Sequence, residues 1–282
     1  MELKEFRSFF NNQLKNLYPK TEIDAFFFRI VAEKLNLSVT DVFMKDSIKL
    51  SDSLVNELQQ ITNKLLQEQP IQYILGTTEF YGLQFDVNEH VLIPRPETEE
   101  LVSWVLDHIK NNLTIKNVLD IGTGSGCIPI SIKKNASDTN VSAIDISAKA
   151  LETAIINAKN NNVLIDFIEK DILTSKSLHQ DYDIIVSNPP YVRELEKQEI
   201  KNNVLANEPH LALFVSNENP LVFYKKIADL ALQHLTNNGV LFLEINQYLG
   251  QETVNMLKNK GFKNIELKKD LFGNNRMIKA SK

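Results

Sequence analysis

The sequence predicts an α/β fold, in which a mostly parallel sheet with helices on both faces follows a small helical domain. Three observations predict it. In about the first 70 residues the apolar side chains recur at helical spacing. From residue 117 onward, short apolar runs alternate with amphipathic stretches long enough to be helices. A Gly-Asn-Asn turn between the last two runs predicts a closing hairpin, which adds one antiparallel strand.

Residues 1–75 are expected to form the helical domain. The side chains assigned to its core are Phe6, Phe9, Phe10, Leu14, Leu17, Ile23, Phe26, Phe27, Ile30 and Val31. Thr21 and Thr40 are expected to cap two helices, because their hydroxyls can accept hydrogen bonds from free backbone N–H groups. Residues 76–91 then show two short strand patterns around Tyr81-Gly82, which predicts a β-hairpin linking the two domains.

The remaining residues, 92–282, are expected to form the α/β domain. Its predicted strands are residues 117–121, 141–146, 166–169, 183–187, 240–245, 264–268 and 276–280. The first five alternate with helical stretches, which is the pattern of a parallel sheet. The last two form the closing hairpin.

Composition and charge argue against several classes of protein. The net charge is -5, without a basic face or a long Lys/Arg block, so a nucleic-acid substrate is disfavoured. The chain has no run of about 18 apolar residues and no signal peptide, so we expect a cytoplasmic protein without membrane contact. The single cysteine, Cys127, has no Cys or His neighbours at metal-ligand spacing. We expect it to pack in the core, and we expect no metal site.

A glycine-rich loop directly follows the first predicted strand of the α/β domain. The loop consists of Gly122, Thr123, Gly124, Ser125 and Gly126. Glycine is needed because a side chain would block the tight turn or the approach of the backbone to a ligand. Dinucleotide-binding folds favour GxGxxG, whereas this loop reads GxGxG. Asp120, just before the loop, would repel a diphosphate but could orient the ammonium of a methionine moiety, so S-adenosylmethionine is favoured over NAD.

Two carboxylates follow the next two predicted strands. Asp145 lies about 20 residues after the loop, where a carboxylate can accept both hydroxyls of a ribose. Asp171 could accept a hydrogen bond from an adenine amino group, with Ile172 beside it to pack on the ring. An N-cap before a short helical turn is an equal alternative for Asp171. Together with the loop, Asp145 indicates an adenosine-containing cofactor.

Asn188, Pro189, Pro190 and Tyr191 directly follow the strand predicted at residues 183–187. They stand at its carboxyl end, the edge where open α/β sheets bind ligands. The two prolines remove two backbone donors and fix φ, so the Asn188 side chain and the Pro189 carbonyl become rigid acceptors. Tyr191 can stack over a flat amide or base. A stiffened turn is the alternative, but the ordered combination with the loop and Asp145 disfavours it.

A planar NH2 group needs two such acceptors. Its lone pair is delocalised, so it attacks a methyl group poorly. Holding both N–H bonds would favour a more tetrahedral nitrogen and direct its lone pair at a sulfonium carbon. The same oxygens would stabilise the positive charge that develops on the nitrogen. The sequence therefore predicts methyl transfer to an amide or amine nitrogen.

Three blocks of the sequence resemble the bacterial release factor glutamine methyltransferase family, also called PrmC or HemK. These blocks are residues 92–99 (LIPRPETE), 120–126 and 188–191. The similarity covers nearly the whole chain, because that family also has an N-terminal helical bundle, a linking hairpin and a Rossmann-like class I methyltransferase domain with a seven-stranded sheet. The sequence departs from the family at Ile172, where an aromatic residue is common, and at residues 215–219, where glycines are usual.

The resemblance implies methylation of the glutamine in the Gly-Gly-Gln motif of class-1 peptide chain release factors, with residues 1–75 recognising this protein partner. By likeness, the glycine loop, Asp145, Ile172 and Asn188 contact the cofactor, while residues 188–191 hold the glutamine. Arg95 and Glu97 would either close over the ligands or form a rigid turn at a helix start. For Glu208 and the loop after Phe214, a place near the site and a plain surface position are equal alternatives. We expect a monomer.

Four alternatives remain. A ribosomal-protein glutamine methyltransferase would share the fold, the cofactor and the Asn-Pro-Pro-Tyr motif, and the sequence cannot separate it from the main interpretation. An adenine-N6 DNA methyltransferase would make the same demands after base flipping. It needs a basic cleft or a recognition domain, and the pI of 5.6 argues against both. The loop spacing disfavours an NAD-dependent oxidoreductase, and the two acceptors disfavour a non-catalytic cofactor-binding scaffold.

Overall fold

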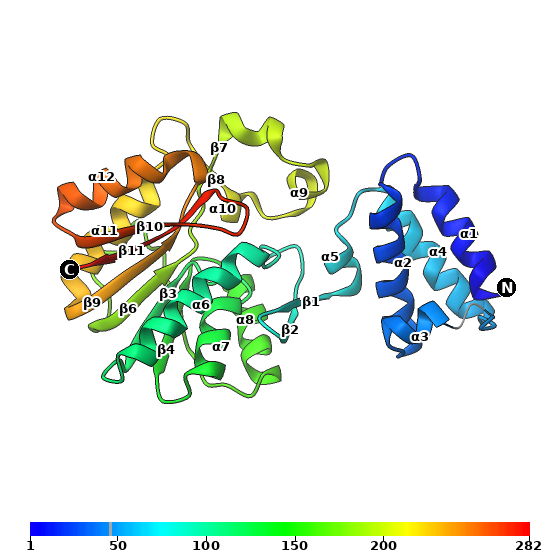
Figure 1. Ribbon diagram of the computed structural model, residues 1–282, viewed down its shortest axis with the longest axis horizontal. Helices are drawn as coiled ribbons and strands as arrows, with labels where there is room; N and C mark the ends of the chain where they lie inside the picture. The colour runs from blue at the N-terminus through cyan, green and yellow to red at the C-terminus, as the bar shows by residue number, and fades with distance from the viewer. Residues whose placement is uncertain (45–46) are drawn as a thin grey trace. The chain divides into compact units, whose positions relative to one another are not determined.

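The computed structural model describes residues 1–44 and 47–282, which form two compact units (Figure 1). The helical unit comprises residues 1–76 and 202–207, and the α/β unit comprises residues 77–201 and 208–282. No helix in the described part of the chain is long and apolar enough to cross a membrane.

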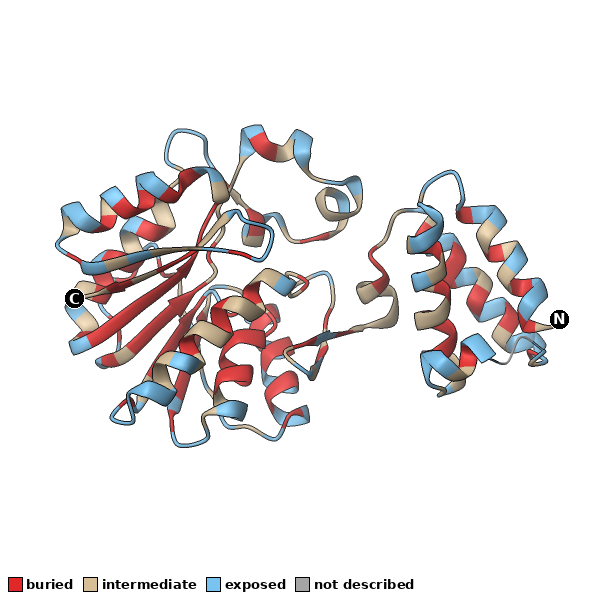
Figure 2. Ribbon diagram, viewed as in Figure 1, coloured by how far each residue is buried: buried red, intermediate tan, exposed pale blue. Residues whose placement is uncertain are grey.

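The helical unit is a small bundle with an aromatic core. Its helices are α1 (Leu3–Leu14), α2 (Lys20–Leu35), α3 (Val39–Met44), α4 (Asp52–Leu66), α5 (Ile71–Leu75) and α9 (Asn202–Asn207). Phe10 of α1 and Phe27 of α2 are both buried, and their rings meet edge to face at 5.7 Å. Most of the predicted core is buried or partly buried, as Figure 2 shows. Leu17 is the exception, because α1 ends at Leu14 and leaves the Leu17 side chain 49% exposed.

Both predicted helix caps are wrong by two residues. Helix α2 begins directly after Pro19, whose extended backbone makes it the N-cap, so Thr21 lies inside the helix. Before α3, the Ser38 hydroxyl accepts the backbone N–H of Asp41 at 3.0 Å, so Ser38 takes the role predicted for Thr40. Proline has a fixed φ suited to such a boundary, and serine is an equally good acceptor, so propensity alone could not choose the residue.

Helix α9 belongs to the helical unit although it is distant in sequence. The Asn202 side-chain amide donates to Glu68 Oε2 at 2.6 Å, and the Asn207 side-chain amide donates to the Glu68 carbonyl at 3.4 Å. Our sequence prediction assigned this segment no place in the helical domain.

The α/β unit contains a seven-stranded sheet with the order β10-β11-β9-β6-β3-β4-β5. Its strands are β3 (Asn117–Ile121), β4 (Asn140–Asp145), β5 (Asp166–Glu169), β6 (Tyr182–Ser187), β9 (Leu235–Glu244), β10 (Lys263–Lys269) and β11 (Asn275–Ser281). All pairs are parallel except those of β11, which runs antiparallel to both β9 and β10. The predicted sheet with one antiparallel strand is confirmed, and β9 begins five residues before the predicted position 240.

Two further pairs of short strands lie outside this sheet. The first is the predicted hairpin, β1 (Thr77–Phe80) with β2 (Leu83–Asp86), which turns at Tyr81-Gly82. The second is β7 (Val192–Arg193) with β8 (Phe214–Val215), which are parallel. The helices of the unit are α6 (Pro96–Asn111), α7 (Cys127–Asn135), α8 (Ala148–Asn160), α10 (His210–Leu213), α11 (Val222–His234) and α12 (Gly250–Lys260), with 3-10 turns η1 (Glu194–Glu199) and η2 (Gln247–Leu249).

Helices cover both faces of the sheet because successive strand residues point to opposite sides (Figure 1). On β3, Val118 packs in the layer of α6 and α7, whereas Leu119 packs in the layer of α11 and α12. Cys127 is buried in the first layer, and burial raises the pKa of its thiol to about 12, so its predicted packing role is confirmed. Strands β3, β4, β6 and β9 are buried along most of their length, whereas the edge strands β5 and β10 contain no buried residue (Figure 2).

Strand β3 lies between β4 and β6, so the chain leaves β3 to one side and later returns on the other. At such a switch point the connections diverge and leave a crevice outside the carboxyl ends of the strands. The glycine loop, Asp145 and Asn188 all lie at these strand ends.

Candidate active site

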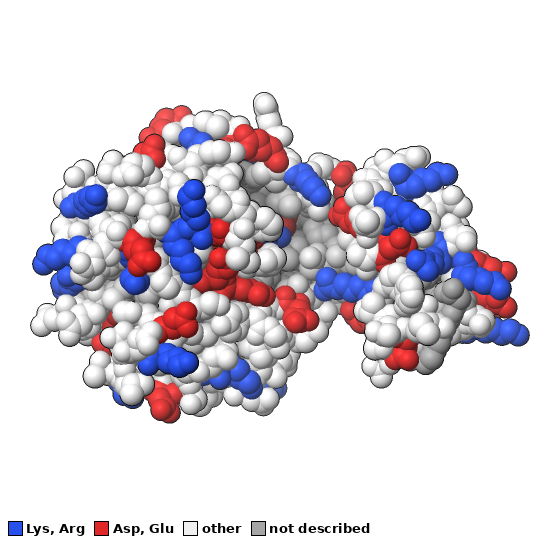
Figure 3. Space-filling view, viewed as in Figure 1, with Lys and Arg blue, Asp and Glu red and all other residues white. Residues whose placement is uncertain are grey.

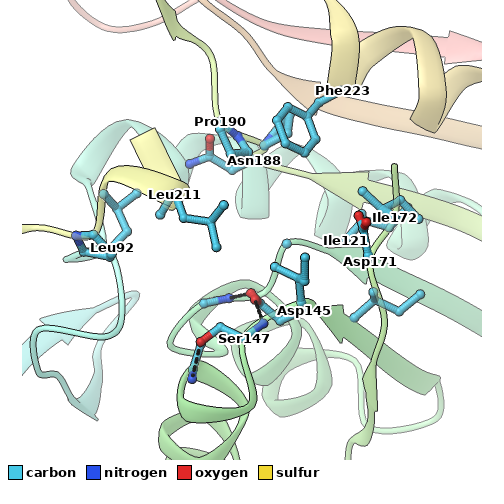
Figure 4. A pocket seen from close by; sticks show the side chains of 18 of the residues that line it. Leu92, Ile121, Asp145, Ser147, Asp171, Ile172, Asn188, Pro190, Leu211 and Phe223 are labelled. Carbon is cyan, nitrogen blue, oxygen red and sulfur yellow. Dashed lines mark hydrogen bonds between the residues drawn. The ribbon is translucent and has the colours of Figure 1, made fainter. Parts of the chain in front are cut away.

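A cavity of about 240 Å³ lies at the carboxyl ends of β3, β4 and β6, inside the α/β unit (Figure 4). Its lining residues are His90, Val91, Leu92, Ile121, Gly122, Gly124, Ile144, Asp145, Ile146, Ser147, Ala150, Lys170, Asp171, Ile172, Leu173, Asn188, Pro189, Pro190, Pro209, Leu211, Ala212, Phe223 and Ile227. Most of these side chains are apolar, and a few polar groups stand among them, as is usual for sites that bind cofactors.

The glycine loop forms one wall of the cavity. Gly122, Gly124 and Gly126 have φ values of +78°, +53° and +81°, in the left-handed region that favours glycine. A Cβ atom on Gly126 would lie 2.9 Å from the Ile130 side chain and 3.1 Å from Ala154 Cβ, so this glycine lets the loop pack against α7 and α8. Gly122 and Gly124 line the cavity.

The other three residues of the loop, Thr123, Ser125 and Gly126, are not among the lining residues. Thr123 and Ser125 are buried, and the carbonyl of Ser125 accepts the Asn157 side-chain amide at 2.9 Å. Ser125 and Gly126 therefore hold the loop against the helices behind it, whereas the Thr123 N–H donates to the Ile144 carbonyl of β4 at 3.0 Å.

Asp145 stands at the end of β4 and ties the loop to the sheet. Its Oδ2 accepts the Gly124 N–H at 2.8 Å, and its Oδ1 accepts the Ser147 N–H at 2.9 Å (Figure 4). Burial raises the pKa of the Asp145 carboxyl, and these backbone donors oppose the shift. The carboxylate also lines the cavity, where a ribose hydroxyl could add a further hydrogen bond.

Asp171 and Ile172 lie on the same wall. Asp171 Oδ1 accepts the Leu173 N–H at 2.9 Å, so this side chain caps a turn, and it also lines the cavity. The two roles predicted for Asp171 are therefore compatible. Ile172 is 7% exposed and belongs both to the core and to the cavity wall, which suits apolar packing on a ring.

Asn188, Pro189 and Pro190 lie across the cavity from Asp145, as Figure 4 shows for the labelled residues. The Asn188 Nδ2 group donates to the Thr98 hydroxyl at 3.2 Å. Within the described chain, neither Asn188 Oδ1 nor the Pro189 carbonyl accepts a hydrogen bond, so both oxygens are available to a ligand.

Tyr191 does not line the cavity. Its hydroxyl donates to Glu244 Oε1 at 3.1 Å, and burial raises the pKa of this phenol, with the nearby Glu244 charge adding to the shift. Stacking of Tyr191 over a bound amide stays a prediction.

Two residues of this region were missing from the predicted site. Thr98 donates to Glu244 Oε2 at 2.7 Å, and the two side chains are 2% and 1% exposed. Glu244 ends the apolar strand β9, which pairs with β6 beside Asn188. The sequence did contain a signal for Glu244, because a charged residue at the end of an apolar strand indicates a possible site residue.

Arg95 and Glu208 form an ion pair with Nη2 and Oε1 2.6 Å apart. Glu208 is buried, and its Oε2 also accepts the Ile93 N–H at 3.2 Å. Neither member of the pair lines the cavity, but Leu92, three residues before Arg95, and Pro209, directly after Glu208, both do. The geometry agrees with the rigid-turn alternative for Arg95 and gives Glu208 a place close to the site.

Asp120 is fully buried at the end of β3. No residue in the described ranges makes a hydrogen bond to either of its carboxylate oxygens. Burial raises its pKa to about 7, and the Asp145 charge adds to this shift. A buried carboxylate without partners is suited to stabilising a cation nearby. The apolar wall and Asp145 thus fit the apolar and ribose parts of S-adenosylmethionine. Asp120 does not line the cavity, so its role near the ammonium of that cofactor stays a prediction.

Comparisons with known proteins identify the family. Residues 5–76 match the PrmC N-terminal domain, and residues 102–213 match the Methyltransferase small domain. A release factor glutamine methyltransferase of Flavobacterium psychrophilum is 51% identical over 286 aligned residues, which cover 100% of this chain and 99% of the relative. The chain belongs to the release factor glutamine methyltransferase family. Another family member, from Bacteroides thetaiotaomicron, is 41% identical over 99% of this chain and 100% of its own length.

Solved structures agree with the fold of this methyltransferase family. The hMettl16 catalytic domain in complex with a 3'UTR hairpin has a TM-score of 0.57 at 19% identity and covers 83% of this chain and 84% of its own. A T. thermophilus 16S rRNA methyltransferase in complex with AdoMet and guanosine has a TM-score of 0.53 at 18% identity. The match covers 73% of this chain and 49% of the rRNA methyltransferase. The protein is a methyltransferase, and its cofactor is S-adenosylmethionine.

The family assignment disfavours the DNA methyltransferase alternative, and the surface agrees. On the face of the α/β unit drawn in Figure 3, Lys and Arg side chains lie among Asp and Glu side chains and form no continuous basic area. A protein that binds duplex DNA needs such an area.

Proposed function

We propose that this protein methylates the side-chain amide nitrogen of the glutamine in the Gly-Gly-Gln motif of a class-1 peptide chain release factor. One observation carries the proposal: no described residue donates a hydrogen bond to Asn188 Oδ1 or to the Pro189 carbonyl, and both residues line the cofactor cavity. Such a pair of acceptors matches the two N–H bonds of a primary amide.

S-adenosylmethionine supplies the methyl group on a sulfonium carbon. Asn188 and Pro189 hold the glutamine NH2 group with its lone pair directed into the cavity, and they stabilise the positive charge that develops on the nitrogen. The cofactor's methyl–sulfur bond would break as the N–C bond forms, leaving S-adenosylhomocysteine, and the amide would release one N–H proton to water. Gly122, Gly124, Asp145, Asp171 and Ile172 bind the cofactor, which leaves Asn188 between the two ligands.

Residues 1–75 are proposed to recognise the release factor. This role explains why a helical unit accompanies a methyltransferase fold that already contains the cavity. Release factors act in translation, so we place the reaction in the cytoplasm. A monomeric enzyme stays a prediction.

A direct test incubates the protein with a purified class-1 release factor and methyl-labelled cofactor, followed by peptide mass spectrometry. We expect one methyl group on the glutamine of the Gly-Gly-Gln motif. A release factor with that glutamine replaced by alanine is the matched control and should remain unlabelled. In a parallel incubation with ribosomal proteins, label on a ribosomal protein but none on the release factor would instead favour the ribosomal-protein alternative.

The site assignment has its own test. Asn188→Ala should lower the rate of methyl transfer by roughly 100-fold, the scale for one lost transition-state contact, while S-adenosylhomocysteine still binds. Calorimetry and single-turnover assays measure the two effects. Unchanged turnover would remove Asn188 from the site.

A further inference from the structure

We propose that Glu244 and Thr98 are positioning residues, which together fix the orientation of the Asn188 side-chain amide. This inference rests on the proposed function, because it assumes that Asn188 Oδ1 binds the substrate amide. Neither residue lines the cavity, so both would act through Asn188.

The three side chains form one hydrogen-bonded chain across the ends of neighbouring elements. Asn188 follows β6, Thr98 lies in the first turn of α6, and Glu244 ends β9. Asn188 Nδ2 donates to Thr98 Oγ1 at 3.2 Å, and Thr98 Oγ1 donates to Glu244 Oε2 at 2.7 Å. The last link is short, as expected for a hydroxyl that donates to a carboxylate.

The direction of these bonds decides which end of the amide faces the ligand. A threonine hydroxyl has one hydrogen, and here Glu244 accepts it. Thr98 Oγ1 then has only lone pairs left for Asn188. It can accept a hydrogen bond from the Asn188 NH2 group, but it has no hydrogen to donate to Asn188 Oδ1. Asn188 Oδ1 is left free for the substrate. The reversed amide would present an NH2 group to the glutamine NH2 group, and no hydrogen bond would form.

Glu244 itself is held in place by further contacts. Its second oxygen, Oε1, accepts the Tyr191 hydroxyl at 3.1 Å. Arg276 lies near enough to contribute positive charge to Glu244 and Tyr191, and it pairs with the buried Asp270 at 3.0 Å. Both oxygens of Glu244 therefore have donors, and the carboxylate cannot turn without breaking one of these bonds. Rigid support of this kind keeps an acceptor in a productive geometry.

The test compares three variants of the full-length protein. Thr98→Val removes the hydroxyl with little change in shape, and kcat should fall about 10-fold while the Kd of S-adenosylhomocysteine changes less than about threefold. Thr98→Ser restores the hydroxyl and should restore kcat to within about threefold of wild type. Thr253→Val is the control, because Thr253 is fully buried in the same unit and its hydroxyl donates to the Leu249 carbonyl at 2.8 Å. Its kcat should not change.

Glu244→Gln tests the last residue in the series of hydrogen bonds from Asn188 through Thr98 to Glu244. Glutamine offers one oxygen where Glu244 offers two, so Thr98 and Tyr191 compete for a single acceptor. We expect kcat to fall several-fold, with S-adenosylhomocysteine binding retained. Wild-type kcat in this variant would remove Glu244 from the proposal.

A double-mutant cycle separates positioning from simple stability. If Thr98 acts through Asn188, Thr98→Val should have no further effect on single-turnover rate in the Asn188→Ala background. Additive losses would overturn the inference, as would equal losses in Thr98→Val and Thr98→Ser. Wild-type kcat in Thr98→Val, beside an inactive Asn188→Ala, would overturn the positioning role and leave the proposed function intact. A wild-type protein that does not methylate the release factor would instead overturn the proposed function.

Discussion

Asp120 and Asp145 stand at the ends of neighbouring strands, yet their surroundings differ. Asp145 accepts two backbone N–H groups, whereas Asp120 accepts none from the described residues. The first arrangement fixes a carboxylate in one geometry, and the second leaves a buried charge uncompensated. Each carboxylate should therefore respond differently to substitution.

Asp145→Ala should weaken cofactor binding by about 1 to 3 kcal/mol, the scale for hydrogen bonds to a charged group. The loss of the tie to Gly124 should contribute, because it frees one wall of the cavity. Calorimetry with S-adenosylhomocysteine measures the change. Glu152→Ala, on the exposed face of α8, is a control that should bind normally. An unaltered dissociation constant for Asp145→Ala would count against the ribose assignment.

Asp120 should make the ligand-free protein less stable as pH rises. Its pKa is about 7 in the folded state and 3.8 in the reference state, so the folded protein binds the extra proton between these values. The free energy of unfolding therefore falls from about pH 4 to about pH 7. Asp120→Asn removes this dependence and should stabilise the ligand-free protein at pH 8, by roughly 4 kcal/mol at most.

Denaturant unfolding of both proteins at pH 5 and pH 8 measures the difference. The same variant should bind S-adenosylmethionine more weakly, because the cationic end of the ligand loses a buried negative charge. Parallel pH profiles for wild type and variant would contradict the predicted ionisation.

At the scale of elements, the glycine loop owes its shape to backbone conformation and to packing. Gly126 needs both a positive φ and the absence of a Cβ atom beside Ile130 and Ala154. Gly261, after α12, also has a positive φ, but a Cβ atom there would meet nothing within 4 Å. Alanine substitutions at Gly126 and Gly261 therefore separate the cost of backbone strain from the cost of overpacking.

Gly126→Ala should destabilise the α/β unit by about 2 to 4 kcal/mol, from backbone strain and overpacking together. Gly261→Ala should cost about 1 to 2 kcal/mol, from strain alone. Thermal unfolding measures both, and cofactor binding should weaken only in Gly126→Ala. Equal losses of stability would show that packing against α7 and α8 contributes nothing.

At the scale of the whole molecule, the chain forms two units with separate cores. The Phe-rich core of the helical unit shares no residue with the cavity. Damage to one unit should therefore leave the chemistry of the other unit intact.

Phe27→Ala should destabilise the helical unit by about 3 to 5 kcal/mol, because a fully buried ring is lost. S-adenosylhomocysteine should bind with unchanged affinity, whereas methylation of the release factor should weaken through a higher KM. Phe43→Ala is the control for stability alone, since the Phe43 ring is 61% exposed and adds little to the core. Calorimetry and steady-state kinetics check both variants, and a large loss of cofactor affinity in Phe27→Ala would contradict the independence of the units.

The sequence by itself determined the order of the seven strands along the chain, the single antiparallel strand, the glycine loop and the motif at Asn188. These features depend on local patterns: alternation of apolar residues, glycine spacing and proline pairs. The same local information misplaced the two helix caps, because several neighbouring residues can satisfy the same backbone donors.

Only the tertiary structure decided which side chains support the site. Thr98 and Glu244 are 146 residues apart, and they meet because α6 packs against β9 near the carboxyl ends of the strands. Glu208 pairs with Arg95 across 113 residues of sequence, and Asn202 joins the helical unit from a distant part of the chain. Such contacts depend on burial and on the register of neighbouring strands, which no local pattern contains.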